Sequence, residues 1–308
     1  MGPDRVFDRH LGGGCPAALW PPAQDRSVVD SVGSIQLGTF YDAFPRVESA
    51  FQAALDESLH PRGPELVLDL VGDLGLLPGA VAIDVGCGEG RHALKLAERY
   101  GFAVFGFDPV ERHVELARAA LAAASEDRPR LRDHVAFALG VAETLPVVDA
   151  CVDLIWCRDV MVHVAELGTV YAEFRRVLRG TGRALIYQTF ATDRLEPLEA
   201  TWLFRTMGVV PSSAHPHATE AAISSAGLRI DDCLDLGTEW GEFAEEKSGK
   251  GNSQLVHAAR LLRNPERYVS RFGHSAYDIM LGDCLWHVYR MIGKLSARIY
   301  VLSVAETP

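Results

Sequence analysis

One short stretch of the chain carries most of its structural information, Ile83-Asp84-Val85-Gly86-Cys87-Gly88-Glu89-Gly90. The apolar, β-branched run at 81–85 predicts a buried parallel strand. From Arg91 onward the apolar residues follow helical spacing, so the three glycines lie on a strand-to-helix turn. Glycine permits positive φ there and removes the Cβ atoms that would keep a ligand away from the backbone. The stretch therefore predicts a turn that binds a ligand against its main chain.

The spacing of the glycines and the acid in front of them restrict the chemical class of the ligand. The turn reads G-x-G-x-G with arginine at position 91, whereas the dinucleotide-binding fingerprint places its third glycine three positions after the second. The carboxylate of Asp84 would repel a pyrophosphate, but it would attract a ligand that carries ammonium and sulfonium charges. S-adenosylmethionine is such a ligand.

A second strand supplies an acid at the distance that a ribose requires. Residues 103–107 are mostly apolar and are followed by Asp108. The separation from the glycine turn is close to the value of about 20 residues expected for an acid that binds ribose hydroxyls. Pro109 then ends the strand. Two further apolar runs, at 135–139 and 152–156, predict the third and fourth strands of the same sheet.

With these motifs, the stretch from about residue 78 to 190 resembles the class I S-adenosylmethionine-dependent methyltransferases, of the small-molecule, methyltransferase type 11-like group. The resemblance implies an α/β fold with a Rossmann-like, seven-stranded, mostly parallel sheet, helices on both faces and an added helical lid. It implies S-adenosyl-L-methionine as the cofactor. It also implies cofactor contacts from the glycine turn, from the two strand-end acids and from the segment after the third strand. These contacts are Asp84, Gly86, Cys87, Gly88, Gly90, Asp108, Pro109, Val141, Ala142 and Glu143.

The resemblance implies two more cofactor contacts outside these motifs. Arg158 follows the fourth strand, where family members line the methionine side of the cofactor, and Tyr41 lies in a predicted helix of the kind that closes over it. Other interpretations stay open for several residues. The glycines can form a tight turn without a ligand, Asp108 can cap the helix that begins near Glu111, and Glu143 can be a carboxylate facing solvent.

The chain organisation suggests one catalytic core with additions. Residues 1–34 are rich in Gly, Pro and Asp and predict a flexible N-terminal arm. Residues 35–77 have apolar side chains at helical spacing and predict helices that contribute to a lid. The core is predicted at 78–308, with helical insertions at about 191–215 and 237–294, because long unstructured loops are uncommon in compact domains. We expect these helices to cover the methyl acceptor and exclude water.

Charge and composition exclude several classes of partner. The net charge of −11 argues against a phosphate-backbone partner, so we expect no nucleic acid. The six cysteines include no C-x-x-C pair, which suits a reducing compartment. No apolar signal region and no run of 18 apolar residues occur, so we expect a cytoplasmic protein without a membrane partner. A homodimer is left open.

No metal is expected. The two histidines of His215-Pro216-His217 lack a paired acid motif and are interpreted as part of a loop. Asp153, Asp159 and Asp193 are too loosely spaced to form the carboxylate cluster of a metal-dependent O-methyltransferase.

Two residues are candidates for catalysis. Methyl transfer needs a sulfonium methyl in line with a nucleophile, so positioning and desolvation should supply much of the rate. His163, after the fourth strand, is predicted to be a general base because histidine titrates near neutrality. It can equally begin a helix and pack on the sheet. Glu239, after the sixth strand, is the second catalytic candidate. It is also a predicted acceptor contact, as are Trp240 and Tyr187.

The sequence therefore predicts methyl transfer from S-adenosylmethionine to a small, apolar or aromatic metabolite, in specialised metabolism. Whether the methyl group goes to oxygen, nitrogen or carbon is undecided. Two alternatives stay open. One is a cyclase or isomerase that binds S-adenosylmethionine without transferring its methyl group, and the other is a non-catalytic, cofactor-binding partner subunit.

Overall fold

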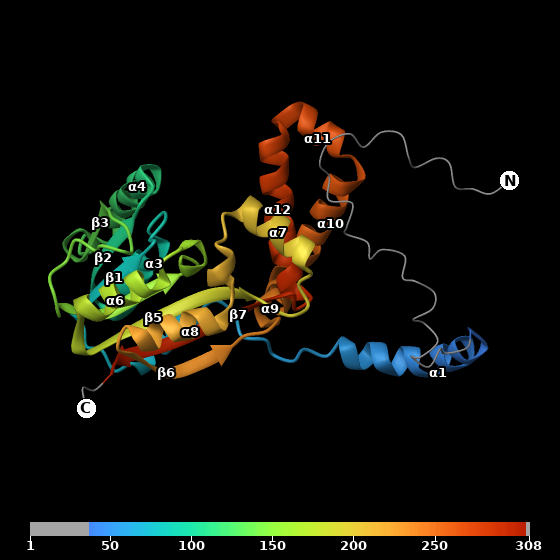
Figure 1. Ribbon diagram of the computed structural model, residues 1–308, viewed down its shortest axis with the longest axis horizontal. Coiled ribbons are helices and arrows are strands. Elements are labelled where there is room, and N and C mark those ends of the chain that lie inside the picture. Colours follow the sequence, from blue (N-terminus) through green and yellow to red (C-terminus); the bar gives the residue numbers. More distant parts are fainter. Residues whose placement is uncertain (1–36, 306–308) are drawn as a thin grey trace. The chain divides into compact units, whose positions relative to one another are not determined.

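The computed structural model describes residues 37–305, with side chains from position 44 onward (Figure 1). The predicted flexible arm at 1–34 lies outside these residues. The chain divides into two compact units. The smaller unit comprises the residues up to His60 together with Glu196–Trp202, and the larger one comprises Pro61–Leu195 and Leu203–Pro308. In the smaller unit, helix α1 (Leu37–Leu55) contains Pro45.

The larger unit is built on a seven-stranded sheet in the order β3-β2-β1-β4-β5-β7-β6. Strands β1 to β5 pair in parallel, whereas β7 runs antiparallel to both β5 and β6. The predicted Rossmann-like, mostly parallel sheet is therefore confirmed. Its strands are β1 (Val81–Val85), β2 (Ala103–Asp108), β3 (Val135–Leu139), β4 (Val152–Arg158), β5 (Leu178–Ala191), β6 (Leu228–Asp235) and β7 (Leu295–Val304).

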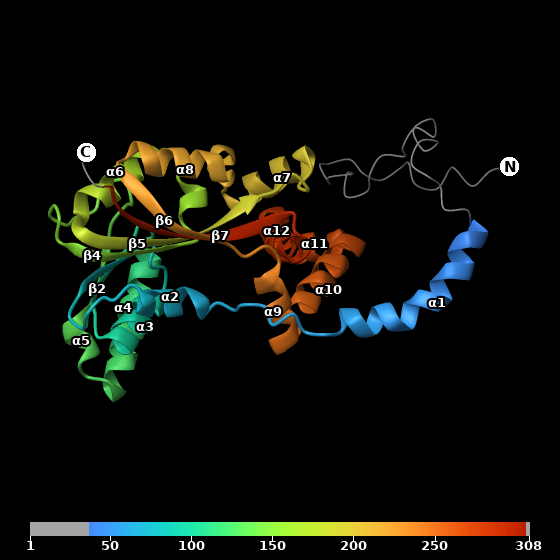
Figure 2. The same cartoon turned by 90° about the horizontal axis from the view of Figure 1, so that it is seen from below.

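Helices cover both faces of this sheet (Figure 2). They include α2 (Leu66–Asp73), α3 (Arg91–Tyr100), α4 (Glu111–Asp127), α5 (Leu131–His134), α6 (Leu167–Val177) and α8 (Pro216–Ser225). On one face, α2, α3 and α4 contribute Val71, Leu96 and Val114 to one apolar core. On the other face, α6 and α8 contribute Phe174 and Ile223 to a second core. The sheet is thus the middle layer of a three-layer α/β structure.

Burial patterns explain why these segments take these forms. Four of the five residues of β1 are buried, as expected for a central parallel strand with helices on both faces. Helix α3 buries Ala93, Leu96 and Ala97, which lie on one side of a helix, and leaves Arg91 and Arg99 exposed. Strand β6, at the edge of the sheet, is mostly exposed.

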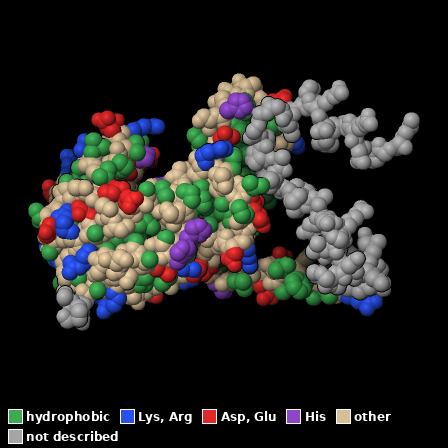
Figure 3. Space-filling view, viewed as in Figure 1, with side chains coloured by type: hydrophobic (Ala, Val, Ile, Leu, Met, Phe, Trp, Pro, Cys, Tyr) green, Lys and Arg blue, Asp and Glu red, His purple; other side chains and the backbone are tan. Residues whose placement is uncertain are grey.

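A helical segment separates β6 from β7, within the region predicted as an insertion at 237–294. Its helices pack on one another, and α12 contacts β7 (Figure 1). Basic and acidic side chains are interspersed over the face that Figure 3 shows. Among the helices of residues 37–305, none combines the length and hydropathy that crossing a bilayer requires. The remaining helices are η2 (Met161–His163), α7 (Pro197–Met207), η3 (Pro211–Ala214), α9 (Glu239–Ser248), α10 (Lys250–Arg263), α11 (Pro265–Phe272) and α12 (His274–Met291).

Candidate functional site

The glycine turn joins β1 to α3 at the carboxyl edge of the parallel strands. Gly86, Gly88 and Gly90 have φ angles of 70°, 52° and 81°, which residues other than glycine rarely adopt. A Cβ atom at Gly86 would lie 2.2 Å from a methyl carbon of Val160, and one at Gly90 would lie 2.5 Å from the ring of Phe137. A Cβ atom at Gly88 would meet nothing within 4 Å. Two of the glycines thus permit close packing, and the middle one borders open space that a ligand can enter.

Asp108 ties the glycine turn to the end of β2. Its Oδ2 accepts a hydrogen bond from the backbone N–H of Gly88 at 2.9 Å, and its Oδ1 accepts one from Val110 at 2.9 Å. The ring Nδ1 of His113 lies 3.1 Å from the same Oδ1. The N-cap position of α4 is Val110, so Asp108 itself is not the cap of that helix. Its carboxylate faces the glycine turn, where the resemblance places the ribose acceptor.

Asp84 is a buried acid with an unused oxygen. Its exposed fraction is 2 %, and its Oδ2 has no hydrogen-bond partner among the described residues. Burial raises the pKa of this carboxyl to about 7, and the charge of Asp108 acts in the same direction. The backbone N–H of Ala93 and the guanidinium of Arg158 lower the pKa. Because an unpaired buried polar atom is costly, the arrangement favours a ligand that brings a donor to this oxygen.

The segment after β3 lies next to Asp108. The backbone N–H of Gly140 donates to the carbonyl oxygen of Asp108 at 3.2 Å, and the segment then closes through a bridge between Val141 and Thr144. Val141 is exposed, whereas Ala142 is buried in the second core. Glu143 is half-buried. The structure thus brings the segment after β3, a predicted cofactor contact, next to the predicted ribose acceptor, with Val141 as its exposed apolar side chain.

Cys87 and Pro109 contribute backbone and shape to the site. Cys87 is buried, and its N–H donates to the carbonyl oxygen of Phe107 at 3.0 Å. Burial, together with the nearby charge of Asp84, raises the pKa of the Cys87 thiol. This thiol is therefore held in its neutral form and is a poor nucleophile. Pro109 is exposed directly after Asp108.

Arg158, at the end of β4, is the centre of a cluster of aromatic and basic side chains. Its Nη1 donates to Nε2 of His92 at 2.8 Å, and burial, with help from Arg158, lowers the pKa of His92 to about 3. The rings of Tyr187 and Trp240 stack 4.4 Å apart, and the Arg158 guanidinium lies 5.3 Å and 5.0 Å from their centroids. Arg290 donates to the Tyr187 hydroxyl at 2.8 Å. The predicted acceptor contacts Tyr187 and Trp240 thus hold two guanidinium groups.

A cavity of about 570 Å³ opens beside this cluster. Arg158 and Trp240 form part of its wall, together with residues of α9, α10 and α12. Sequence reasoning named Arg158 and Trp240, but it missed His92 and Arg290. The signal for His92 was its place directly after the glycine turn, in the first turn of α3. No local signal marked Arg290, which reaches the site only through the packing of α12.

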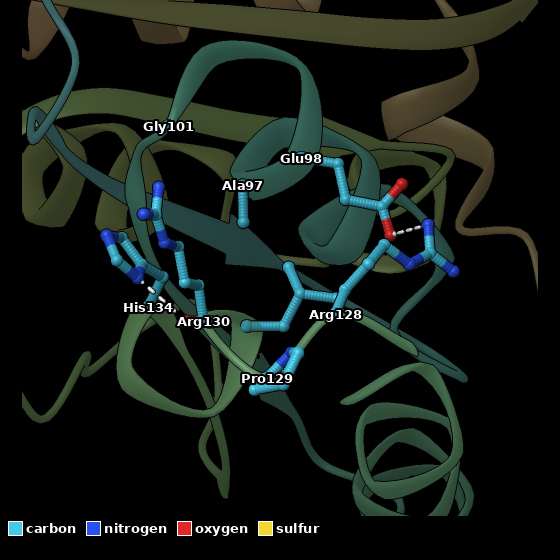
Figure 4. A pocket seen from close by; sticks show the side chains of 8 residues that line it. Ala97, Glu98, Gly101, Arg128, Pro129, Arg130 and His134 are labelled. Atoms are coloured by element: carbon cyan, nitrogen blue, oxygen red, sulfur yellow. Dashed lines mark hydrogen bonds and ion pairs between the residues drawn. The ribbon is translucent and has the colours of Figure 1, made fainter. Parts of the chain in front are cut away.

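A second hollow, of about 510 Å³, lies at the other end of α3 (Figure 4). Glu98 and Arg128 form an ion pair beside it, and Nδ1 of His134 bonds to the carbonyl oxygen of Arg130 at 2.8 Å. Glu98 is eight residues beyond Gly90, which at 1.5 Å per residue corresponds to about 12 Å along the helix. This hollow is therefore separate from the candidate site.

His163 lies on η2, shortly after β4, and its side chain is exposed. Its Nδ1 is 2.8 Å from the carbonyl oxygen of Gly208. A carbonyl oxygen can only accept, so Nδ1 carries the proton of this hydrogen bond. In the neutral ring, Nε2 then has a free lone pair, which is the form that a general base requires.

The geometry does not support a catalytic role for Glu239. Both of its carboxylate oxygens accept hydrogen bonds from the Arg62 guanidinium, with Nε at 2.7 Å, and one also accepts from the Arg62 backbone N–H at 2.9 Å. This pairing lowers the pKa of Glu239. Its carboxylate is therefore engaged in an ion pair that ties α9 to the segment before α2.

The predicted cofactor contact Tyr41 and the expected absence of a metal remain to be compared with the structure. Tyr41 belongs to α1, but its side chain lies outside the described residues. Among the side chains from position 44 to 305, no three His, Cys, Asp or Glu residues gather as metal ligands. The expectation of no metal requirement stays a prediction.

Comparisons with known proteins agree with this geometry. A family model described as a methyltransferase domain matches residues 83–186. The chain is 27% identical to methyltransferase GfsG of Streptomyces halstedii over 234 residues, which cover 70% of this chain and 80% of that protein. It is also 27% identical to 27-O-demethylrifamycin SV methyltransferase of Amycolatopsis mediterranei over 237 residues, which cover 72% and 85%. Among solved structures, the [4+2]-cyclase SpnF shares the fold, with a TM-score of 0.61, 19% identity and coverage of 88% and 97%.

Proposed function

We propose that the chain, which belongs to the class I S-adenosylmethionine-dependent methyltransferases, methylates an oxygen atom of a small molecule and that His163 is the general base. The observation that carries this proposal is the hydrogen bond from Nδ1 of His163 to Gly208, which leaves Nε2 free to take a proton. The name of the Amycolatopsis relative places its methylation at an oxygen, which supports the same choice here. An apolar or aromatic acceptor body and a role in specialised metabolism remain part of the proposal.

The residues present fit S-adenosylmethionine. The unpartnered Oδ2 of Asp84 would accept a hydrogen bond from the methionine ammonium. Asp108 would accept a ribose hydroxyl at Oδ2, which has a second lone pair beside the one used by the Gly88 N–H, whereas Oδ1 already lies against Val110 N–H and His113. The open space at Gly88 would let the cofactor lie against the main chain. Bound S-adenosylmethionine supplies an electrophilic methyl group on a sulfonium and leaves as S-adenosylhomocysteine.

The protein contributes a base and a positioned site. Nε2 of His163 takes the proton of the acceptor hydroxyl, so that the oxygen meets the methyl group as a stronger nucleophile. Asp84 and Asp108 would hold the methionine ammonium and the ribose of the cofactor, and much of the rate comes from holding the acceptor in line. The Tyr187–Trp240 stack is less suited to stabilise a carbocation, because two guanidinium groups already lie against it.

Product analysis tests the acceptor atom and the base. Purified protein is incubated with S-adenosylmethionine and a panel of phenols, aliphatic alcohols and amines, and formation of S-adenosylhomocysteine is followed. NMR of the product then locates the methyl group. We expect an O-methyl product, and a loss of ~10²-fold in kcat/KM for His163→Gln with unchanged cofactor affinity. His134→Gln, in the separate hollow of Figure 4, is the matched control and should turn over normally.

Two outcomes would overturn this assignment: a methyl group on nitrogen or carbon, or normal turnover by His163→Gln. Formation of S-adenosylhomocysteine with a methylated product would also exclude the alternatives of a cyclase without methyl transfer and of a non-catalytic subunit.

Calorimetry tests the cofactor residues separately. Titration with S-adenosylmethionine and S-adenosylhomocysteine should show binding that Asp108→Asn weakens more than tenfold, which corresponds to about 1.4 kcal/mol. Equal affinity in the variant would remove Asp108 from the ribose contacts. The thermal unfolding temperature of the variant serves as the control for the loss of its local backbone hydrogen bonds.

A further inference from the structure

The cavity beside Arg158 is lined by an unusual density of positive charge. Five cationic side chains reach it from three parts of the larger unit: the start of α3, the end of β4, and the helices α9, α10 and α12. No Asp or Glu is among its described lining residues. The chain as a whole carries a net charge of −11, so the cluster is opposite in sign to the protein around it. The five cations, called the cation cluster below, are Arg91, Arg158, Lys247, Lys250 and Arg290.

Most of this charge is not neutralised by the protein. Arg158 has a carboxylate neighbour, with its Nε 3.4 Å from Asp159. Arg290 bonds to the neutral hydroxyl of Tyr187. Arg91, Lys247 and Lys250 have no ion pair with any described carboxylate. Like charges held around one cavity repel one another, so an anion in the cavity would relieve an unfavourable arrangement.

The cofactor cannot supply enough negative charge. S-adenosylmethionine has one carboxylate, and its ammonium and sulfonium groups give it a net positive charge. One cationic side chain is sufficient to pair with one carboxylate, and Arg158 already lies beside Asp159, which leaves three of the cluster without a carboxylate partner. A second, more highly charged anion is needed to match them.

The cavity adjoins the place where methyl transfer would occur. Arg158 lines the cavity and also lowers the pKa of Asp84, so its guanidinium lies within electrostatic reach of the cofactor turn. Arg91 directly follows Gly90 as the first residue of α3, where the helix dipole also favours negative charge. An acceptor in this cavity would therefore have its anionic end at the cation cluster and its other end near the cofactor.

From these observations we infer that the methyl acceptor carries a multiply charged oxyanion, of the phosphate or diphosphate ester class, which the cation cluster binds. The inference rests on the proposed transfer to a small-molecule acceptor and names the chemistry of that acceptor. Arginine forks and lysine ammonium groups both bind phosphate oxygens well, and the cavity offers both. The aromatic pair Tyr187–Trp240 keeps Arg158 and Arg290 in place without neutralising them.

Calorimetric titration with simple anions tests the inference without any knowledge of the acceptor. The full chain, saturated with S-adenosylhomocysteine, is titrated with pyrophosphate, inorganic phosphate and acetate at 150 mM salt. We expect pyrophosphate to bind more tightly than phosphate, and acetate to show no binding. The double variant Lys247→Ala/Lys250→Ala should weaken pyrophosphate binding at least tenfold.

The matched control is Arg112→Ala/Arg263→Ala, which removes two exposed arginines that do not line the cavity. It lowers the net charge by the same amount and should leave pyrophosphate binding unchanged. Both double variants should bind S-adenosylhomocysteine as the wild type does, which shows that they are folded.

Several results would overturn the inference. Absence of pyrophosphate binding to the wild type would do so, and so would equal weakening in both double variants, because the effect would then be one of overall charge. Competition between pyrophosphate and S-adenosylhomocysteine would assign the cluster to the cofactor carboxylate instead. Acetate binding as tight as that of pyrophosphate would refute a multiply charged oxyanion. Failure of the proposed O-methylation is read separately, from the position of the methyl group in the product.

Discussion

The buried carboxyl of Asp84 should make the stability of the cofactor-free protein depend on pH. Its pKa rises from an ordinary 3.8 to about 7 in the folded chain, chiefly through burial. Below about pH 4 the folded and unfolded chains both hold the proton. Between about pH 4 and pH 7 the unfolded chain has lost it and the folded chain has kept it, so folding becomes less favourable as the pH rises. Above about pH 7 both chains are ionised and the penalty is constant.

The size of the effect follows from the pKa difference. About 3 pH units at about 1.4 kcal/mol each give a total penalty of about 4 kcal/mol at pH 8. The variant Asp84→Asn keeps the shape of the side chain but has no proton to lose. Relative to pH 5, the free energy of unfolding of the wild type at pH 8 should therefore fall by about 3 kcal/mol more than that of the variant, since only the interval from pH 5 to pH 7 contributes.

Urea unfolding of both proteins without cofactor, followed by tryptophan fluorescence at pH 5, 6, 7 and 8, measures this difference. The quantity of interest is the gap between variant and wild type, because other titrating groups affect both proteins alike. A gap that stays constant within about 0.5 kcal/mol from pH 5 to pH 8 would refute a raised pKa at Asp84. S-adenosylmethionine should favour the ionised carboxylate and bind the variant more weakly at pH 8, although that variant is the more stable protein.

Three further substitutions separate packing, loop and surface roles. Gly86→Ala places a Cβ atom 2.2 Å from Val160 at a φ of 70°, and should cost about 2 kcal/mol or more, measured by thermal unfolding. Glu173→Ala removes the acceptor for the Leu145 backbone N–H, 2.6 Å away, and should loosen the segment after β3 and weaken S-adenosylmethionine binding several-fold in calorimetry; unchanged affinity would contradict this. Glu239→Gln should lower stability by less than about 1 kcal/mol and leave turnover unchanged, and a large loss of kcat would restore its catalytic role.

The sequence was sufficient for the parts of the site that are local in the chain. The predicted strands at 81–85 and 135–139 agree with β1 and β3, and the predicted acid at the end of the second strand lies at the end of β2. Strand, turn and acid are contiguous, and each leaves a short pattern of apolar residues and glycines. The number of strands and their mostly parallel pairing followed from the resemblance, whereas the strand order came only from the structure, because no local pattern specifies which strands are neighbours.

The cation cluster could not be predicted in the same way. Arg91 is separated from Lys247 and Arg290 by most of the chain, and each of these residues alone is typical of a solvated helix face. Their meeting depends on how the helices between β6 and β7 pack against the rest of the larger unit. Glu239 shows the same limit, because its partner Arg62 lies 177 residues away in sequence. Long-range pairs of charged side chains leave no periodic signal.

The antiparallel pairing of β6 and β7 brings together the two ends of the helical segment between these strands. Asp235, at the end of β6, lies opposite Arg298, and its carboxylate also accepts a hydrogen bond from Ser296 at 2.6 Å. The sheet itself therefore holds together the two ends of the segment that carries α9 to α12, so the length of that segment adds little to the cost of closing it. The segment is in this sense a replaceable unit. A helical stretch of another length between β6 and β7 should leave the strands that build the glycine turn in place, because both of its ends stay fixed by the sheet.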